Sequence, residues 1–370
     1  MTWTQKLKIL LTIFTATGVL ATSNFVFKRT LTGDEARVRN FYLEEKDSLD
    51  MVFIGASTAY TDYSAPLAWH EFGITSYSLA TNSAPMGIAK SMVKEVLKYQ
   101  KPKLILIDIN GILYNDDEEV KEASLRRWID NMRDSENKEE TIKELVPEGE
   151  RDNYRNPLVK YHNNWEKADE YIEATKREIY MRMNKENLAI LGDEGSTKIA
   201  PQNNLVDIKN YQNCSPMYKK SGQHLIDLLE YLKKEDINNV VFTNMPRFYK
   251  QKMIPERERY NEAKRNIKAY GYTCLDLDDH VEEIGLNPKT DFYNYNHLNM
   301  YGREKSTKYL ISYLLGHYKL ASDHNENIVK KWNQEYESYK KLYQWADEKM
   351  KSGEDVRYTT KEIMEILNLS

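Results

Sequence analysis

Cysteine and histidine are scarce in this sequence. Its 370 residues include two cysteines, Cys214 and Cys274, and seven histidines. Two cysteines exclude a disulfide scaffold and a cysteine-rich zinc or iron–sulfur site, and their spacing leaves open whether they pair or remain free thiols. The histidines are scattered, without a His-x-x-x-His pair or a Cys/His pair at the spacing of metal ligands. We therefore expect neither a metal centre nor a bound cofactor.

An excess of positive charge is also lacking. The 53 lysines and arginines are outnumbered by 57 aspartates and glutamates, which leaves a net charge of −4. Nucleic-acid-binding proteins need a basic surface to contact phosphates, so we expect no nucleic-acid partner. Apolar residues make up 41% and charged residues 30%, which is typical of a folded chain with a core. The length fits a few average domains or one α/β domain with insertions.

Long apolar runs are limited to one, residues 9–27, which contain no charged residue. As a helix, this run spans about 28 Å at ~1.5 Å per residue, close to the ~30 Å core of a bilayer. The flanking charges are nearly balanced and do not fix the orientation: Lys6 and Lys8 precede the run, and Lys28, Arg29 and Arg37 follow it.

A cleaved signal peptide with a small-residue site near residues 21–23 is the alternative to an anchor over residues 1–29. The run is longer than a usual signal core, which favours the uncleaved anchor. In both cases we expect the main domain to lie outside the cytoplasm. With the anchor, the protein is a single-pass protein of the cell membrane.

The rest of the chain alternates between strand and helix patterns. Residues 51–55 and 103–109 are continuous apolar runs, as in strands that are buried on both faces of a parallel sheet. Between them lie a predicted strand at 75–79 and a helix at 86–100, which completes a βαβ pattern. The alternation returns later in helix 222–234, strand 239–243, helix 255–270, strand 273–277 and helix 302–316. We therefore predict a flavodoxin-like, three-layer α/β/α domain with a parallel sheet over residues 30–320.

Two segments depart from this alternation. Residues 116–220 form a predicted helical insertion. Its first part, 116–152, has 21 charged residues out of 37 and predicts solvated helices; a charged helix follows to about Asn187, and 188–216 are irregular. The C-terminal tail, 321–370, is predicted to be helical. It carries an aromatic stripe that either packs against the domain or binds a partner helix: Trp332, Tyr336, Tyr339, Tyr343 and Trp345.

Ser57 and His297 are the candidate catalytic residues. Ser57 follows the first strand through Gly55-Ala56, so a tight turn would present its hydroxyl at the carboxyl edge of the sheet, where ligands bind in such folds. A serine hydroxyl needs a base to become a nucleophile. His297 lies just before the last helix of the same domain and is a base of the required kind. Alone, Ser57 is as readily explained as a helix cap.

These residues belong to four stretches that resemble the SGNH/GDSL hydrolase superfamily. The stretches are 53–58, 76–82, 104–111 and 294–302. The likeness is to a membrane-anchored bacterial branch, similar to the teichoic-acid D-alanylation and alginate O-acetylation proteins. Tyr161–Trp165 resembles a recurrent feature of these anchored relatives and has no role that we can derive. The expected fold is accordingly SGNH hydrolase-like.

The resemblance also implies roles for individual residues. Ser57 would be the nucleophile and His297 the base, with Asn294 at the place of the triad aspartate and Asp291 as the alternative partner of the imidazole. The backbone N–H of Ala80, where the family has glycine, and that of Ser57 would bind the oxyanion. The third block of the family is absent, and Asn110 is its best replacement. The residues after the fourth predicted strand, Arg247, Phe248 and Tyr249, either shape substrate access or begin a loop.

The implied function is an extracytoplasmic serine-dependent O-acyltransferase or esterase. Its substrate would be a cell-surface polysaccharide or teichoic acid, and its partner a membrane-bound O-acyltransferase. The alternative is a catalytically weak or inactive member of the fold that acts as a binding or assembly component of a polymer-modification or export complex. Asn294 and the absent third block favour this alternative, whereas Ser57 and His297 oppose it. A lipase or esterase acting on small esters is a third reading.

Overall fold

The computed structural model describes residues 1–156, 160–184, 188–320 and 323–369. Five parallel strands form the central sheet in the order β2-β1-β3-β6-β8. Numbered along the chain, this is the 2-1-3-4-5 order of doubly wound α/β sheets. The strands are β1 (Met51–Gly55), β2 (Ser76–Ala80), β3 (Leu104–Asp108), β6 (Val240–Asn244) and β8 (Thr273–Asp276). The prediction of an α/β chain with a parallel sheet is confirmed.

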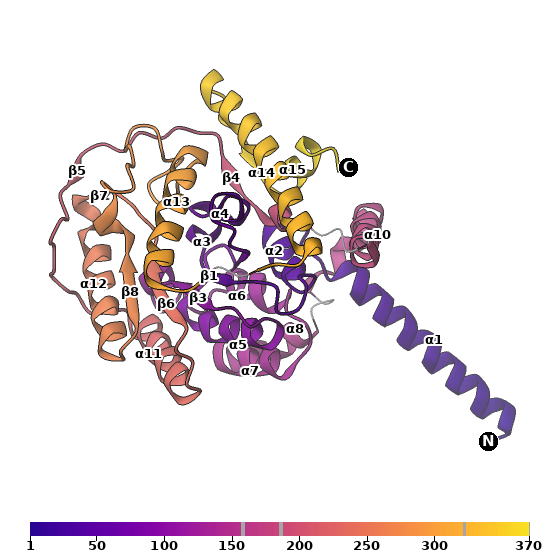
Figure 1. Cartoon of the computed structure of the whole chain (residues 1–370). Helices are drawn as coiled ribbons and strands as arrows, with labels where there is room; N and C mark the ends of the chain where they lie inside the picture. Colours follow the sequence, from indigo (N-terminus) through magenta and orange to yellow (C-terminus); the bar gives the residue numbers. More distant parts are fainter. Residues whose placement is uncertain (157–159, 185–187, 321–322, 370) are drawn as a thin grey trace.

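Helices cover both faces of the sheet, because the apolar strands must be shielded from water on both sides. Every residue of β1 and β3 is buried. The helices α4 (Ala65–Phe72) and α13 (Met300–His317) pack together over one face, with the short α3 (Thr58–Thr61) beside β2 (Figure 1). The other face carries α5 (Ala89–Tyr99), α11 (Lys219–Lys234) and α12 (Ile254–Ala269).

The insertion contributes to the core as well as to the surface. Its helices are α6 (Glu122–Ile129), α7 (Glu136–Leu145), α8 (Arg151–Arg155) and α10 (Ala168–Asn184). Leu125, Trp128 and Ile129 of α6 are fully buried in the main core, so the prediction of merely solvated helices missed one apolar face. Asn187, the predicted end of the last charged helix, lies outside the described residues.

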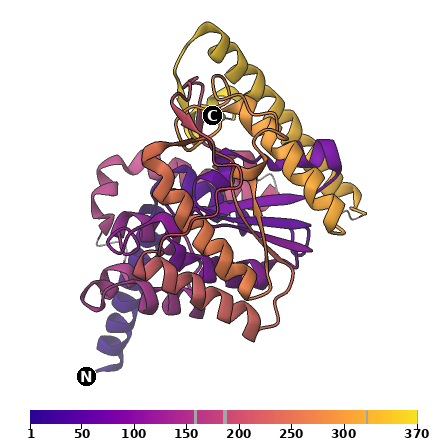
Figure 2. The same cartoon turned by 90° about the vertical axis from the view of Figure 1, so that its left-hand side faces the viewer.

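The C-terminal segment packs against the domain. It consists of α14 (Glu326–Ser352), β9 (Arg357–Tyr358) and α15 (Thr360–Ile366). In the aromatic stripe, Trp332 and Tyr339 are buried, and the Trp332 ring lies 6.3 Å from that of Trp69 in α4. Figure 2 shows α14 running along the outside of the domain. β9 pairs antiparallel with β4 (Gly195–Ser196), which lies in the irregular stretch of the insertion, 188–216.

The N-terminal helix α1 (Trp3–Phe27) projects from the body, with its first residue at the far end (Figure 1). Among the described residues it is the one helix long and apolar enough to cross a membrane, and none of its membrane-spanning window is buried. This helix is consistent with the predicted single-pass anchor. Cys214 is exposed and Cys274 half-buried, and both are free thiols.

Candidate active site

The turn after β1 presents Ser57 at the carboxyl edge of the sheet. Gly55 has a φ of +147°, and a Cβ there would lie 2.6 Å from the Cβ of Asp108, so glycine is required on both counts. The Asp108 carboxylate accepts hydrogen bonds from the Ala56 N–H (3.3 Å) and the Thr58 hydroxyl (2.7 Å). The turn that carries Ser57 is therefore fastened to the end of the neighbouring strand β3.

His297 lies directly beside Ser57. Its Nε2 is 2.7 Å from the Ser57 Oγ, although 240 residues separate the two in sequence. Its other ring nitrogen, Nδ1, lies 3.1 Å from the side-chain oxygen of Asn294. This arrangement fits the tautomer in which Nδ1–H donates to Asn294 and Nε2 accepts from the serine hydroxyl. Ser57, His297 and Asn294 thus form a continuous hydrogen-bonded chain.

The Asn294 side chain shapes the histidine loop as well as contacting the ring. Its Oδ1 accepts the backbone N–H groups of Asn296 (2.8 Å) and His297 (2.9 Å), which is the local turn that asparagine favours. The same oxygen therefore serves three donors. An amide carries no charge, so Asn294 orients the imidazole without stabilising an imidazolium as a carboxylate would.

Two further contacts hold the histidine. The ring of Tyr293 stacks on the imidazole with centroids 5.4 Å apart. The Asp62 carboxylate, which follows α3, accepts the backbone N–H of Leu298 at 2.9 Å. Burial raises the pKa of Asp62 to about 7. The loop is thus fastened to the segment that follows Ser57.

The pKa of His297 is lowered to about 4. Burial is the largest cause, followed by the positive charges of Arg247 and Arg357. The imidazole is therefore neutral at neutral pH, the form that can accept the serine proton. The low pKa also makes it a weaker base than an ordinary histidine.

Ser57 and His297 line a cavity of about 200 Å³. This is smaller than the ~300–1,000 Å³ of typical ligand pockets, and it suits a group of few atoms. Much of its wall is polar and comes from segments that are distant in sequence: Asn82, just after β2; Glu194 and Ser196, at β4; and Arg357, in β9. The Arg357 guanidinium lies 3.7 Å from the Glu194 carboxylate and is largely exposed.

The wall residues were not predicted from the sequence. Only Asn82 lies in a stretch that resembles a family block, the second one. Glu194 and Arg357 lie in no such stretch. They reach the cavity through the β4–β9 ladder, in which Ser196 pairs with Arg357, and two-residue strands leave no periodic pattern.

Asp291, the alternative partner for His297, is engaged elsewhere. Its carboxylate accepts hydrogen bonds from the Thr290 hydroxyl (2.8 Å) and the Asn287 N–H (2.7 Å), and pairs with the Lys305 ammonium at 2.7 Å. The atom beside His297 Nδ1 belongs to Asn294. Asp291 therefore braces the start of the loop and does not orient the imidazole.

Besides the Ser57 N–H, the groups expected to bind the oxyanion are the backbone N–H of Ala80 and the side chain of Asn110. Ala80 is fully buried at the end of β2, and its carbonyl accepts from Arg37 Nε at 2.9 Å. The Asn110 side-chain oxygen accepts from Tyr260 (2.7 Å) and Arg247 (3.0 Å). Neither is among the described residues that line the cavity. The candidate donors at the cavity are the Ser57 N–H, as expected, and the side-chain amide of Asn82, whose backbone N–H donates to Asp34 at 2.7 Å.

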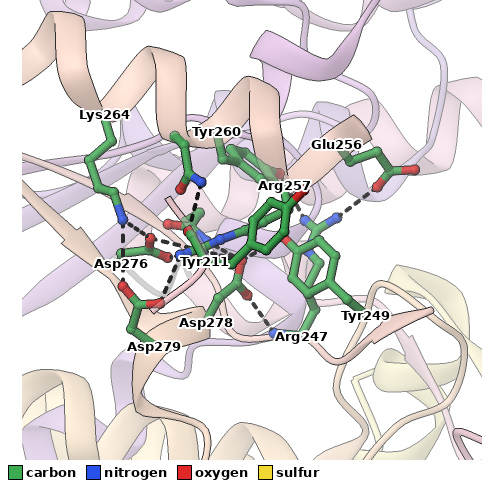
Figure 3. Close-up of polar contacts among 12 residues, drawn as sticks. Tyr211, Arg247, Tyr249, Glu256, Arg257, Tyr260, Lys264, Asp276, Asp278 and Asp279 are labelled. Carbon is green, nitrogen blue, oxygen red and sulfur yellow. Dashed lines mark hydrogen bonds and ion pairs between the residues drawn. The ribbon is translucent and has the colours of Figure 1, made fainter. Parts of the chain in front are cut away.

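A cluster of charged side chains, most of them buried, lies between α12 and the end of β8 (Figure 3). Arg257 is fully buried and pairs with the carboxylates of Asp276 (2.9 Å), Asp278 (3.4 Å) and Asp279 (2.7 Å). Lys264 also pairs with Asp276. We refer to these five residues as the Arg257 network.

Arg247 connects the Arg257 network to the histidine loop. Its backbone N–H donates to Asp278 at 2.9 Å, and its guanidinium donates to the Asn296 side chain at 3.2 Å. Tyr249, two residues on, donates its hydroxyl to Asp278 at 2.6 Å. Arg247 and Tyr249 are thus buried supports rather than residues at a substrate entrance.

No known protein family matches the sequence, and no curated protein matches it either. Within the described residues, no group of three or more histidine, cysteine, aspartate or glutamate side chains is arranged to hold a metal ion. The side chains at the cavity offer a hydroxyl, a neutral imidazole that accepts its proton, and an amide that orients the ring.

Proposed function

We propose that the protein is a serine-dependent acyltransferase or ester hydrolase with the SGNH hydrolase fold. The observation that carries this proposal is the 2.7 Å contact between Ser57 Oγ and His297 Nε2 at the carboxyl edge of a parallel sheet. The orienting contact from Asn294 to the other ring nitrogen supports it, because a nucleophile, a base and an orienting group are the parts that acyl transfer needs.

The reaction proceeds in two halves. As Ser57 Oγ attacks an acyl carbonyl carbon, its proton moves to His297 Nε2, and the carbonyl π pair becomes an oxyanion. When that pair re-forms the double bond, the bond to the donor oxygen breaks and His297 returns the proton to the leaving alcohol. An acceptor hydroxyl, or water, then attacks the acyl-serine and gives its proton to His297 Nε2. As the bond between the acyl carbon and Ser57 Oγ breaks, His297 returns that proton to Ser57 Oγ. The backbone N–H of Ser57 and the side-chain amide of Asn82 would donate hydrogen bonds to the oxyanion.

The substrate we propose is a cell-surface polysaccharide or teichoic acid carrying a short acyl group. The small, polar cavity supports a short group over a fatty acyl chain. We further propose that α1 anchors the protein as a single-pass helix and that the domain works outside the cytoplasm. A membrane-bound O-acyltransferase that brings acyl groups across the bilayer is the partner that such a reaction calls for.

The alternative is a catalytically weak or inactive binding component of a polymer-modification or export complex. Two observations favour it. The residue beside Nδ1 is an uncharged amide, and the pKa of His297 is lowered to about 4. Both reduce the ability of the histidine to take up a proton during acyl transfer.

A serine-directed fluorophosphonate separates these two functions. The full-length chain in detergent is treated with the reagent, and its intact mass is measured beside Ser57→Ala and His297→Ala. One adduct in the wild type that is lost in Ser57→Ala and strongly reduced in His297→Ala supports the enzyme. A folded wild-type chain, verified by circular dichroism, that forms no adduct overturns the catalytic proposal in favour of the binding component.

A further inference from the structure

The Tyr161–Trp165 stretch lies where the apolar helix α1 joins the body. The Asn164 side-chain amide donates hydrogen bonds to the carbonyls of Phe27 (2.8 Å) and Arg29 (2.9 Å). Carbonyls at a helix C-terminus lack partners within the helix, so Asn164 supplies one for the last residue of α1. The Phe27 ring also lies 6.4 Å from that of Tyr171 in α10. These contacts fasten the end of α1 to the segment at 162–184.

The helix α10 lies across the end of α1 rather than alongside it. In Figure 1, α10 is seen nearly end-on, whereas α1 extends across the view away from the body. The 3₁₀ segment η4 (His162–Lys167) leads directly into α10. If α1 crosses a bilayer, a helix in this position runs near the plane of the membrane surface.

One side of this segment exposes apolar side chains. Ile172, Ile179 and Met183 are seven and four residues apart in α10, a spacing that places them in one stripe of the helix, and Trp165 lies in η4 just before it. Their exposed fractions are 63% for Trp165, 37% for Ile172, 43% for Ile179 and 79% for Met183. We call these four residues the α10 stripe.

We propose that the α10 stripe docks on the bilayer that α1 crosses, with Trp165 at the headgroup level. Tryptophan is enriched at membrane–water interfaces, and an amphipathic helix lying in the interface buries its apolar side about 5–10 Å into it. Lys176 lies on the same side of the helix, where its long stem can run along the apolar surface while the ammonium stays in water.

We infer that the bilayer covers the stripe, because the stripe begins beside α1, whose apolar side chains would lie in lipid. The side chains of α1 are unburied within the body, and Asn164 and Tyr171 hold its last residue beside the start of the stripe. A body held at this point presents the neighbouring surface to the headgroups. The inference rests on α1 as the membrane helix and is independent of the chemistry at Ser57.

We call the Asn164 hydrogen bonds and the Phe27–Tyr171 ring contact the clamp. Together with the α10 stripe, the clamp fixes the orientation of the domain relative to the membrane. A single helix followed by a loose linker would let the domain tumble above the bilayer. Here Asn164 of η4 donates hydrogen bonds to Phe27 at the end of α1 and to Arg29 just beyond it. The Phe27 ring contacts Tyr171 of α10, and the stripe adds a second attachment beside these contacts. The mouth of the cavity at Ser57 is then held at one height and one direction relative to the lipid surface.

An environment-sensitive label tests the docking. The full-length chain with Cys214→Ser and Cys274→Ser receives one cysteine at a time, labelled with a nitrobenzoxadiazole probe and reconstituted in vesicles of phosphatidylcholine and phosphatidylglycerol. Ile172→Cys and Ile179→Cys report on the stripe. Leu205→Cys is the matched control, an exposed apolar position in β5 (Leu205–Val206), on the opposite side of the body in Figure 1.

We expect blue-shifted, several-fold brighter emission that brominated lipids quench at the two stripe positions, and aqueous emission at the control. Aqueous emission at 172 and 179, in chains that resist carbonate extraction, overturns the docking. The docking on lipid is overturned as well if the probes at these positions leave water only after a membrane extract is added, because the occupant would then be a protein.

Asn164→Ala tests the clamp in the same assay. With the anchor still inserted, we expect partial loss of quenching at Ile172→Cys. Unchanged quenching would show that the stripe docks without the clamp and would overturn that part of the inference. Fluorophosphonate labelling of Ser57, measured on the same samples, reports the proposed function separately.

Discussion

Two groups of polar side chains lie at the same edge of the sheet and differ in almost every physical respect. The Ser57–His297 pair carries no net charge at neutral pH and opens into a cavity. The Arg257 network, between α12 and the end of β8, consists of charged side chains. Its arginine is fully buried, and each of its members pairs with an opposite charge.

The difference separates groups placed for reaction from groups placed for support. A buried ion needs an opposite charge, and a partner lost by mutation leaves an uncompensated charge at high cost. A neutral imidazole beside a hydroxyl has no such requirement, and it gains a charge only when it takes a proton. We therefore expect mutations in the pair to change reactivity at little cost in stability, and mutations in the network to do the reverse.

The largest expected effect is that of His297→Ala on reactivity. Loss of the base should slow fluorophosphonate labelling of Ser57 by about 10²–10⁴-fold, the range for general-base catalysis. The free energy of unfolding should change by no more than about 1–2 kcal/mol, as for an ordinary partly exposed substitution. Labelling kinetics and urea denaturation measure the two quantities. A labelling rate equal to that of the wild type would contradict the role of His297.

Arg257→Ala should produce the opposite pattern. It leaves the buried carboxylates of Asp276 and Asp278 and the exposed one of Asp279 without the cation that they share, and the expected loss of stability is about 3–5 kcal/mol. Lys209→Ala, which breaks an exposed pair with Glu282, is the matched control and should cost less than about 1 kcal/mol. Urea denaturation compares them. Equal stability of the two variants would remove the distinction between the clusters.

Asn294→Asp should sharpen the reactive side of the comparison. A carboxylate beside Nδ1 raises the pKa of the imidazole and stabilises its protonated form, so labelling at pH 7 should rise by roughly three- to tenfold. Asp291→Asn is the control, because the Asp291 carboxylate contacts Lys305 rather than the ring, and it should leave the rate unchanged. A slower rate in Asp291→Asn, with no increase in Asn294→Asp, would reassign the orienting role to residue 291.

The smallest expected effect is a shift in pH dependence. Because the folded-state pKa of His297 is lowered to about 4, the wild-type labelling rate should fall only near that pH. The stability contribution of this neutral histidine is complete above its unfolded pKa of about 6.5 and declines as the pH falls toward 4.

Arg357→Gln removes one of the positive charges that lower this pKa, so the midpoint should move upward. Lys198→Gln, a surface residue paired with Asp355, should leave the midpoint in place. Labelling rates across pH 3–8, roughly the range that brackets both histidine forms, provide the measurement. A midpoint near 6.5 in the wild type would refute the lowered pKa.

Features with local signals in the sequence were predictable. The strands at 51–55 and 103–109 are apolar runs, and their flanking helices carry a periodic apolar face. Ser57 was expected at the carboxyl edge because it follows a strand of a parallel sheet. Its pairing with His297 was expected from the place of the histidine before the last helix and from the SGNH resemblance. The burial of Trp128 was hidden because α6 is rich in charge on its other side, and net composition says little about a single face.

Features that depend on side-chain direction within loops were not predictable. Asp291 and Asn294 lie in the same loop, and only the folded turn decides which one meets the imidazole. Ala80 ends β2 and Asn110 follows β3, on either side of β1, but neither is among the described residues that line the cavity. Arg357 reaches the site through contacts between segments 160 residues apart, for which no single-sequence pattern exists.

The ladder of β4 with β9 has a consequence for how such a protein can diversify. One wall of the cavity is delivered by the C-terminal segment through two residue pairs, whereas Ser57 and His297 belong to the central sheet and its loops. Substitutions in this wall would change the shape and charge of the cavity while leaving the backbone that carries Ser57 and His297 in place, although Arg357 also acts on the pKa of His297. Under the proposed function, descendants of this chain would exchange the molecule they modify through the wall and keep the reaction at Ser57.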